Sequence, residues 1–237
     1  MGVLKELFTP LSARKEIWRA RRSRICEYLR FAVQQRRMGF EIGDHPWLDE
    51  ESSPVFERMI ENCSSYLEYG SGGSTVFAAR LNKPFVTVDT DRFFLEAVRR
   101  KIERLASDQH LLYGNIGWTT EYGYPIFTTP RASRQKKWKA YIEMPWLYLE
   151  SGRFPDLVMI DGRFRVAAAL TSCLHLAQSP AKSKIVIDDY AERPQYHVIE
   201  KYLRLVGMDG RMAIFESTPQ DSANIREVIQ QHLADPR

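Results

Sequence analysis

Three glycines, Gly70, Gly72 and Gly73, lie between an apolar run and two hydroxyl residues, in the order Tyr-Leu-Glu-Tyr-Gly-Ser-Gly-Gly-Ser-Thr from residue 66 to residue 75. Glycine has no Cβ atom, so a turn of this composition allows the backbone to approach a ligand closely. Ser74 and Thr75 then begin a helix, where backbone N–H groups have no partner within the helix. The stretch therefore predicts a strand, a tight turn and a helix start that bind a polar ligand.

The charge beside this turn indicates which kind of ligand it binds. Glu68 precedes Gly70 by two residues, and its carboxylate would repel a pyrophosphate, so a cationic or hydroxyl-rich ligand is favoured. The dinucleotide-binding fingerprint needs a third glycine at the position of Thr75. The phosphate-binding loop needs a Gly-Lys-Ser or Gly-Lys-Thr sequence, which does not follow the turn. An enzyme that depends on a nicotinamide dinucleotide is therefore disfavoured.

Acidic or amide side chains also follow the later segments that have the composition of strands. Asp89 comes 21 residues after Glu68, and one carboxylate at such a strand end can accept hydrogen bonds from two ribose hydroxyls. The later strand ends carry Asn115, Asp161 and the pair Asp188-Asp189. Ligands of parallel α/β sheets bind outside the carboxyl ends of the strands. We therefore expect all these side chains to face one site.

Three of these residues are aspartates, and their charges need compensation. Carboxylates that converge from adjacent strands repel one another unless a cation or a proton lies between them. One candidate is a divalent ion with oxygen ligands, most simply Mg²⁺. The other is arginine, because Arg163 and Arg165 follow Asp161 in the same loop. These arginines equally suit a carboxylate, phosphate or sugar acid on a substrate, so the sequence leaves the alternatives open.

The segment from Glu68 to Gly72 resembles motif I of the class I S-adenosylmethionine-dependent methyltransferases, Glu-x-Gly-x-Gly, with Ser74 where many members have a third glycine. The resemblance covers about residues 52–217. It implies that S-adenosylmethionine is the cofactor, with Asp89 on its ribose and Asn115 near the adenine amine, where other members often have an acid. The cofactor-binding residues that it implies are Glu68, Gly70, Ser71, Gly72, Asp89, Asn115 and Asp161.

The later strand ends resemble those of the metal-dependent O-methyltransferases of the catechol and macrocin types. These enzymes bind Mg²⁺ through an acid after the fourth strand and an acid followed by Asp or Asn after the fifth. The resemblance implies Asp161, Asp188 and Asp189 as metal ligands, and Asp161, Asp188 and Arg163 as catalytic residues. The catalytic lysine of the catechol enzymes has no clear equivalent in this chain. A metal would lower the pKa of the acceptor oxygen and fix its position.

Strands and helices alternate along the chain, and they must position these residues. Strand composition is found from Tyr66 and in the segments 85–89, 110–116, 156–160 and 184–187, and helical composition in 74–81 and 92–106. Such alternation predicts a parallel sheet covered on both faces. Asp209-Gly210 between two apolar runs predicts a hairpin. We therefore expect an α/β fold, a doubly wound, mostly parallel seven-stranded sheet with a C-terminal antiparallel hairpin.

A long segment, residues 117–152, separates the third and fourth expected strands. It is rich in aromatic residues and carries a basic run: Trp118, Tyr122, Tyr124, Phe127, Trp138, Tyr141, Trp146 and Tyr148, with Arg131, Arg134, Lys136, Lys137 and Lys139. Insertions at this edge of a sheet often act as lids or acceptor-binding loops. The composition fits binding of a sugar or another polar ring. Nucleic acid stacked on the aromatic residues is a second possible ligand. In the third alternative, the segment binds no ligand and is a flap whose aromatic residues only cover the core.

The N-terminal arm, residues 1–50, differs in charge from the domain formed by residues 51–237. Residues 1–40 hold ten lysines and arginines against three glutamates, whereas the rest of the chain is slightly acidic, which argues against a nucleic-acid-binding core. Residues 12–37 have helical composition, with an apolar stripe at Ile17, Ile25, Leu29 and Val33 that Arg21 interrupts, and with Tyr28 and Ala32 beside it. A basic helix of this kind contacts an anionic membrane, a second subunit or its own domain.

Composition sets the remaining bounds. No apolar run is long enough to cross a membrane, and the start of the chain lacks the layout of a secretory signal, so we expect a cytoplasmic protein. The cysteines, Cys26, Cys63 and Cys173, are odd in number and widely spaced, which predicts buried free thiols. The sequence thus predicts a methyltransferase that acts on oxygen of a small-molecule or glycan-like acceptor. The alternative is a non-catalytic module that docks a partner through residues 117–152.

Overall fold

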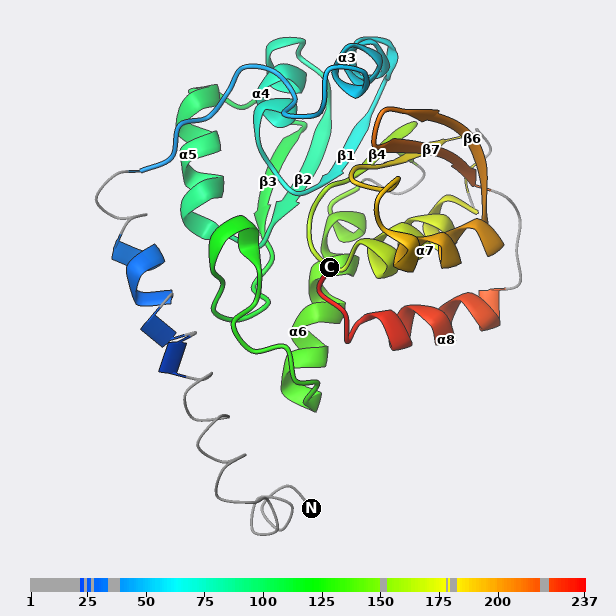
Figure 1. Ribbon diagram of the computed structural model, residues 1–237. Helices are drawn as coiled ribbons and strands as arrows, with labels where there is room; N and C mark the ends of the chain where they lie inside the picture. The colour runs from blue at the N-terminus through cyan, green and yellow to red at the C-terminus, as the bar shows by residue number, and fades with distance from the viewer. Residues whose placement is uncertain are drawn as a thin grey trace.

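A seven-stranded sheet forms the centre of the molecule (Figure 1). The computed structural model describes residues 22–23, 25–26, 28–33, 39–149, 153–177, 179, 183–217 and 222–237. The strands are β1 (Tyr66–Tyr69), β2 (Phe85–Asp89), β3 (Gln109–Tyr113), β4 (Leu157–Ile160), β5 (Lys184–Ile187), β6 (Leu203–Asp209) and β7 (Met212–Ser217). Their order is β3-β2-β1-β4-β5-β7-β6, and only β7 pairs antiparallel, with β5 and β6. The predicted doubly wound α/β fold with a C-terminal hairpin is confirmed.

Helices cover both faces of this sheet (Figure 1). They are α3 (Ser52–Asn62), α4 (Gly73–Arg80), α5 (Arg92–Ile102), α6 (Ala132–Glu143), α7 (Arg165–Leu176) and α8 (Ser222–His232), with short 3₁₀ helices at Glu121–Gly123, Met144–Leu147 and Pro194–Lys201. Successive strand residues point to opposite faces. Leu67 therefore packs in the core with α6, α7 and α8, whereas Tyr66 packs in the core with α3. Buried apolar residues on both faces explain why the parallel strands are apolar without alternation.

Several predicted boundaries are shifted by local structure. Helix α5 begins where Asp91 accepts hydrogen bonds from the amides of Phe93 and Phe94, and it ends at Ile102, before the predicted residue 106. Strand β3 ends at Tyr113 rather than residue 116. The hairpin turns at Gly210, whose φ of +55° favours glycine. The start of α5 at residue 92 is as predicted, whereas the ends of α5 and β3 come earlier than composition indicates.

The insertion divides its aromatic residues between two environments. Trp138 and Tyr141 of α6 are buried in the main core, and Trp138 packs 5.4 Å from the ring of Phe164. Gly114 and Gly162 leave room for Tyr141, because a Cβ atom at either position would lie 2.3 Å from its ring or its hydroxyl. The exposed aromatic residues of the insertion are Trp118, Tyr122, Tyr124, Phe127 and Tyr148. The plain interpretation, a flap that covers the core, is therefore right for α6.

The described part of the arm helix lies within residues 22–33 and contacts the domain through aromatic rings. Tyr28 stacks on Trp118 with ring centroids 5.1 Å apart, and Phe31 is buried. The predicted stripe faces outward instead, with Leu29 54% exposed, while Ile17 and Arg21 lie outside the described residues. Cys26 is also exposed, so the expectation of a buried thiol was wrong there, whereas Cys63 and Cys173 are buried and free. Among the described residues, no helix has the length and apolar character needed to cross a bilayer.

Candidate cofactor and acceptor site

The glycines of the turn after β1 have separate roles. Gly70 has a φ of +95°, and a Cβ atom there would lie 3.0 Å from the backbone carbon of Asp161. Gly73 faces the backbone of His45, which would clash with any side chain. Gly72 has no atom within 4 Å of its Cβ position. Gly70 and Gly73 therefore permit backbone packing, whereas Gly72 leaves the turn open to a ligand.

Glu68 lies behind this turn and is buried. Its carboxylate accepts hydrogen bonds from the hydroxyl groups of Ser74, Thr75 at 2.6 Å and Thr87 at 3.1 Å. Burial raises the pKa of Glu68 to about 7, although these hydroxyl groups oppose the shift. The carboxylate of Glu68 thus links β1 to β2 and to the start of α4, and it stabilises the turn between them. Glu68 would therefore act on a cofactor indirectly, through the position of this turn.

Asp89 lies at the end of β2, beside the same turn. Its Oδ2 accepts hydrogen bonds from the amide of Ser71 at 2.8 Å and from its hydroxyl at 2.6 Å. Its Oδ1 accepts from the amide of Asp91 at 2.7 Å. Burial raises the pKa of Asp89 against these hydrogen bonds. A carboxylate has about four acceptor positions, so Asp89 retains capacity for a hydroxyl group of a ligand.

Asn115 follows β3 and is exposed. Its Oδ1 accepts a hydrogen bond from the amide of Gly117 at 3.0 Å. The neighbouring strand β2 brings Asp89 to the same edge of the sheet, because Asp89 and Tyr113 are paired residues of β2 and β3. Asn115 therefore lies at the same edge of the sheet as Asp89. Its side chain stabilises a local bend of the backbone through the amide of Gly117.

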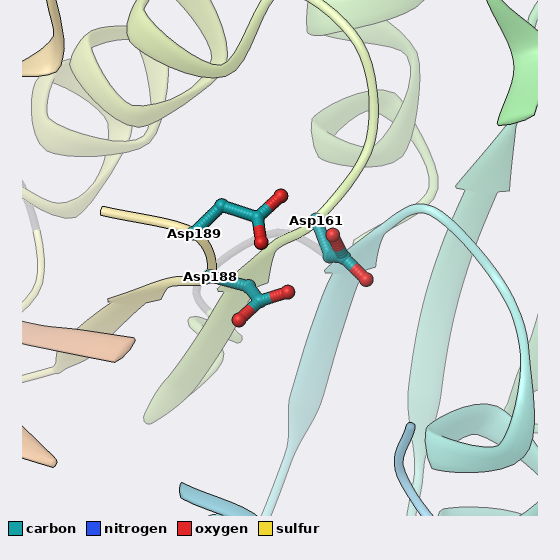
Figure 2. A group of neighbouring side chains, drawn as sticks. All are labelled: Asp161, Asp188 and Asp189. Atoms are coloured by element: carbon teal, nitrogen blue, oxygen red, sulfur yellow. The ribbon is translucent and has the colours of Figure 1, made fainter. Parts of the chain in front are cut away.

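The three aspartates converge, as Figure 2 shows. Each of Asp161, Asp188 and Asp189 offers a carboxylate oxygen, and these oxygens lie within 4.8 Å of one another. Asp161 follows β4, and the other two follow β5, the adjacent strand. Asp188 is buried, whereas the side chain of Asp161 is 41% exposed. Convergence at neighbouring strand ends explains the short separation.

Three arginines compensate these carboxylates. Arg165 donates to Asp161 Oδ1 at 2.7 Å and to Asp189 Oδ2 at 3.1 Å. Arg211 donates to both oxygens of Asp188, at 2.9 and 3.1 Å. Arg193 donates to Asp189 Oδ2 at 2.7 Å. Burial raises the pKa of Asp161, Arg165 opposes that shift, and the two neighbouring aspartates add to it.

This compensation bears directly on a metal. The donors would suit Mg²⁺ by their chemistry and spacing, but three aspartates with Arg165, Arg193 and Arg211 already have no net charge. Arg165 is only 4% exposed, and its charge, fixed between Asp161 and Asp189, would repel a divalent ion. The residues therefore do not fit a metal with the arginines in place, and we assign no step to one.

One contributor to the site was missing from the sequence expectations, and a second was expected only as part of the insertion. Arg211 directly precedes the return strand of the hairpin, β7, and the pairing of β7 with β5 brings it to Asp188. Tyr141 belongs to α6, and its hydroxyl accepts a hydrogen bond from the amide of Arg163 at 3.3 Å. The hairpin signal was a usable clue for Arg211, because an arginine directly after that turn must lie near a sheet edge.

Comparison with known proteins supports the fold. No protein-family model and no curated protein matches the sequence. The structure is similar to that of a methyltransferase-like protein from Silicibacter pomeroyi, with a TM-score of 0.69 and 26% identity over 83% of this chain and 100% of that chain. The chain has the fold of the class I S-adenosylmethionine-dependent methyltransferases.

Two other solved structures of methyltransferases are less similar to this chain. One, from Geobacter sulfurreducens, has a TM-score of 0.47 and 12% identity, covering 82% of this chain and 88% of that chain. The other is an O-methyltransferase from Bacillus cereus in complex with SAH, with a TM-score of 0.42 and 14% identity over 83% and 91% of the two chains.

Proposed function

We propose that the protein is an S-adenosylmethionine-dependent methyltransferase. The observation that carries this proposal is the open backbone at Gly72, which adjoins Asp89 through Ser71. A hydroxyl-rich nucleoside suits that pair, because Asp89 keeps acceptor capacity and the turn has no side chain in the way. Gly70 places the same turn against the backbone of Asp161, so the cofactor and the acid after β4 share one site.

Methyl transfer is an in-line displacement at a sulfonium carbon, so the protein mainly orients the reactants and accepts the proton of the acceptor. Asp161 is the most exposed of the three aspartates, and we assign it as the base for a hydroxyl acceptor. Asp188 is buried and held by Arg211, so its role is to position the loop after β5. This arrangement favours transfer to oxygen.

The acceptor proposed here is a small molecule or a glycan-like molecule. Trp118 and Tyr122 of the insertion are 57% and 75% exposed, and the guanidinium of Arg134 lies 5.0 Å from the ring centre of Phe127. Aromatic faces beside cations suit polar rings. The non-catalytic docking module is not favoured, because three of the large aromatic residues of the insertion, Trp138, Tyr141 and Trp146, are buried in the core and not available to a partner.

The arm supports a second contact. Ile25, Leu29 and Val33 form an exposed apolar stripe beside Arg22 and Arg30, which suits an anionic membrane surface or a second subunit. Leu29→Glu should weaken sedimentation with anionic vesicles if the membrane is the partner, and should shift the oligomeric state if it is a second subunit. An unchanged result in both measurements would remove this proposal.

Calorimetric titration with S-adenosylmethionine and S-adenosylhomocysteine tests the proposed activity, followed by a methyl-transfer assay on a panel of phenols, sugars and hydroxy acids. We expect both nucleosides to bind and at least one hydroxyl acceptor to be methylated. Asp161→Asn should abolish transfer while cofactor binding persists. Absence of binding by either nucleoside would contradict the proposal, and binding without turnover would revive the docking module.

A further inference from the structure

Four arginines lie around the aspartate cluster, and three of them are occupied. Arg165, Arg193 and Arg211 each form an ion pair with at least one of the three aspartates. The charges of these six residues cancel. The fourth, Arg163, follows the same strand as Asp161 and brings one further positive charge to this edge of the sheet.

Arg163 has donors that the protein does not use. Its Nε is buried and has no hydrogen-bond partner, and Arg163 forms no ion pair with any residue that the structure describes. A buried donor without a partner costs free energy, and native structures seldom leave one. Asp161, the acid two residues before it, is engaged by Arg165 at 2.7 Å. The described chain therefore leaves the partner of Arg163 to water or a ligand, and its positive charge favours an anionic ligand.

The surroundings of Arg163 define the chemistry of that partner. Its backbone is held by the hydroxyl of Tyr141, and Phe164 beside it is fully buried, so the loop is fixed rather than free to turn away. A guanidinium presents a planar fork of donors that matches the two oxygens of a carboxylate. A neutral ligand would leave the positive charge of Arg163 uncompensated at a partly buried position.

We propose that Arg163 binds a carboxylate group of a ligand at this site. This proposal rests on the proposed methyltransferase function, and it means that at least one ligand of the site carries a carboxylate. Two ligands can supply the carboxylate: an acidic acceptor, or the amino acid end of the S-adenosyl cofactor. Both would meet the same fork of donors at the loop after β4. Arg165 cannot take this role, because the aspartates occupy it.

The cofactor source is tested with two nucleosides that differ in the carboxylate. S-adenosylhomocysteine carries an amino acid end, whereas 5′-methylthioadenosine has the same adenosine and thioether without it. Calorimetric titration would use the wild-type chain, Arg163→Met, Arg163→Lys and the exposed control Arg99→Met on α5. If the cofactor supplies the carboxylate, Arg163→Met lowers the affinity for S-adenosylhomocysteine about tenfold or more and leaves the affinity for methylthioadenosine unchanged.

The acceptor source is tested with the pair 4-hydroxybenzoate and 4-hydroxybenzamide, and with glucuronate and glucose, titrated with and without saturating S-adenosylhomocysteine. If the acceptor supplies the carboxylate, the wild-type chain prefers the acids by about tenfold, and Arg163→Met removes the preference. Arg163→Lys should keep part of it, because the charge remains while the fork is lost. Arg99→Met should match the wild-type chain.

The outcomes separate this inference from the proposed function. Indistinguishable affinities of the wild-type chain and Arg163→Met for all six probes would overturn the carboxylate site, even if S-adenosylhomocysteine binds. Failure of the wild-type chain to bind either nucleoside would instead contradict the methyltransferase proposal. In that case the carboxylate site would still be supported if the wild-type chain prefers the acids and Arg163→Met abolishes this preference. Circular dichroism and thermal unfolding of each variant verify that the fold is kept.

Discussion

The two halves of the site stabilise their carboxylates by different means. In the half formed by β1 and β2, Glu68 and Asp89 accept hydrogen bonds from hydroxyl and amide groups and have no cationic partner in their hydrogen bonds. In the half formed by β4 and β5, Asp161, Asp188 and Asp189 are all paired with arginines. Neutral donors leave the charge of a carboxylate available to a ligand, whereas arginines cancel it.

This difference assigns the halves to different ligand chemistry. Burial raises the pKa of Glu68 and of Asp89 because neutral hydrogen bonds only partly replace water around the charge. Burial also raises the pKa of Asp161, and there the charge of Arg165 opposes the shift. A neutral, hydroxyl-rich nucleoside suits the first half, and a charged group that meets Arg163 suits the second.

The largest effect should come from removing the central arginine. Arg165→Gln leaves Asp161 and Asp189 without their shared partner in a buried setting, and we expect the free energy of unfolding to fall by about 3–5 kcal/mol. Urea denaturation measures this loss. The matched control is Arg204→Gln, because Arg204 pairs with Glu216 while 57% exposed, and such a pair is worth at most about 1 kcal/mol. Equal losses in the two variants would show that the cluster does not depend on Arg165.

Glu68 should give the next largest effect, and it should depend on pH. Its pKa is raised from 4.5 to about 7, so its contribution to stability is fully present below about pH 4.5 and is lost as pH rises through 7. The loss amounts to about 3 kcal/mol at most. Glu68→Gln cannot ionise, so its stability relative to the wild-type chain should improve between pH 5 and pH 8.

Urea denaturation of Glu68→Gln and of the wild-type chain at both pH values measures this change. The exposed control Glu96→Gln, on the surface of α5, should keep a constant difference from the wild-type chain. A constant difference for Glu68→Gln as well would mean that the buried carboxylate does not titrate in this range.

The turn glycines should give a smaller effect that separates packing from binding. Gly70→Ala forces a Cβ atom against the backbone of Asp161 at a φ of +95°, which should cost about 1–3 kcal/mol of unfolding free energy. Gly72→Ala meets no atom within 4 Å, so stability should change by less than about 0.5 kcal/mol. Because its methyl group enters the ligand space, affinity for S-adenosylhomocysteine should fall about tenfold or more. If Gly72→Ala leaves the affinity unchanged, the cofactor does not bind at this turn.

The sequence was sufficient for the parts of this comparison that depend on local pattern. Apolar runs located the parallel strands, Asp209-Gly210 located the hairpin, and the polar residue after each strand was placed at one edge. These follow from periodicity and turn chemistry. The expected helix start at residue 92 was also correct, because the side chain that caps this helix, Asp91, acts within three residues.

The sequence was not sufficient where distant segments meet. Nothing local indicates that Arg211 pairs with Asp188, because the contact depends on β7 lying beside β5. Likewise, Tyr141 joins the core because two distant glycines leave space for its ring. The arm helix packs through Tyr28, at the side of the predicted stripe, and not through Ile25, Leu29 and Val33, because Trp118 offers a matching aromatic face. Tertiary contact decides these positions, and periodicity does not.

The smallest effect should come from metal ions, and it sharpens the contrast between the halves. Arginines already cancel the charge of the aspartate cluster, so millimolar Mg²⁺ or a chelator should leave thermal unfolding and methyl transfer of the wild-type chain unchanged. Arg211→Gln removes the bidentate partner of Asp188 and leaves that buried carboxylate without its arginine beside two other carboxylates. Mg²⁺ should then raise the unfolding temperature of this variant, since a ligand that binds only the folded state stabilises it. If a chelator instead abolishes the activity of the wild-type chain, Asp161, Asp188 and Asp189 are metal ligands. The arginines would then have to move aside when the ion binds.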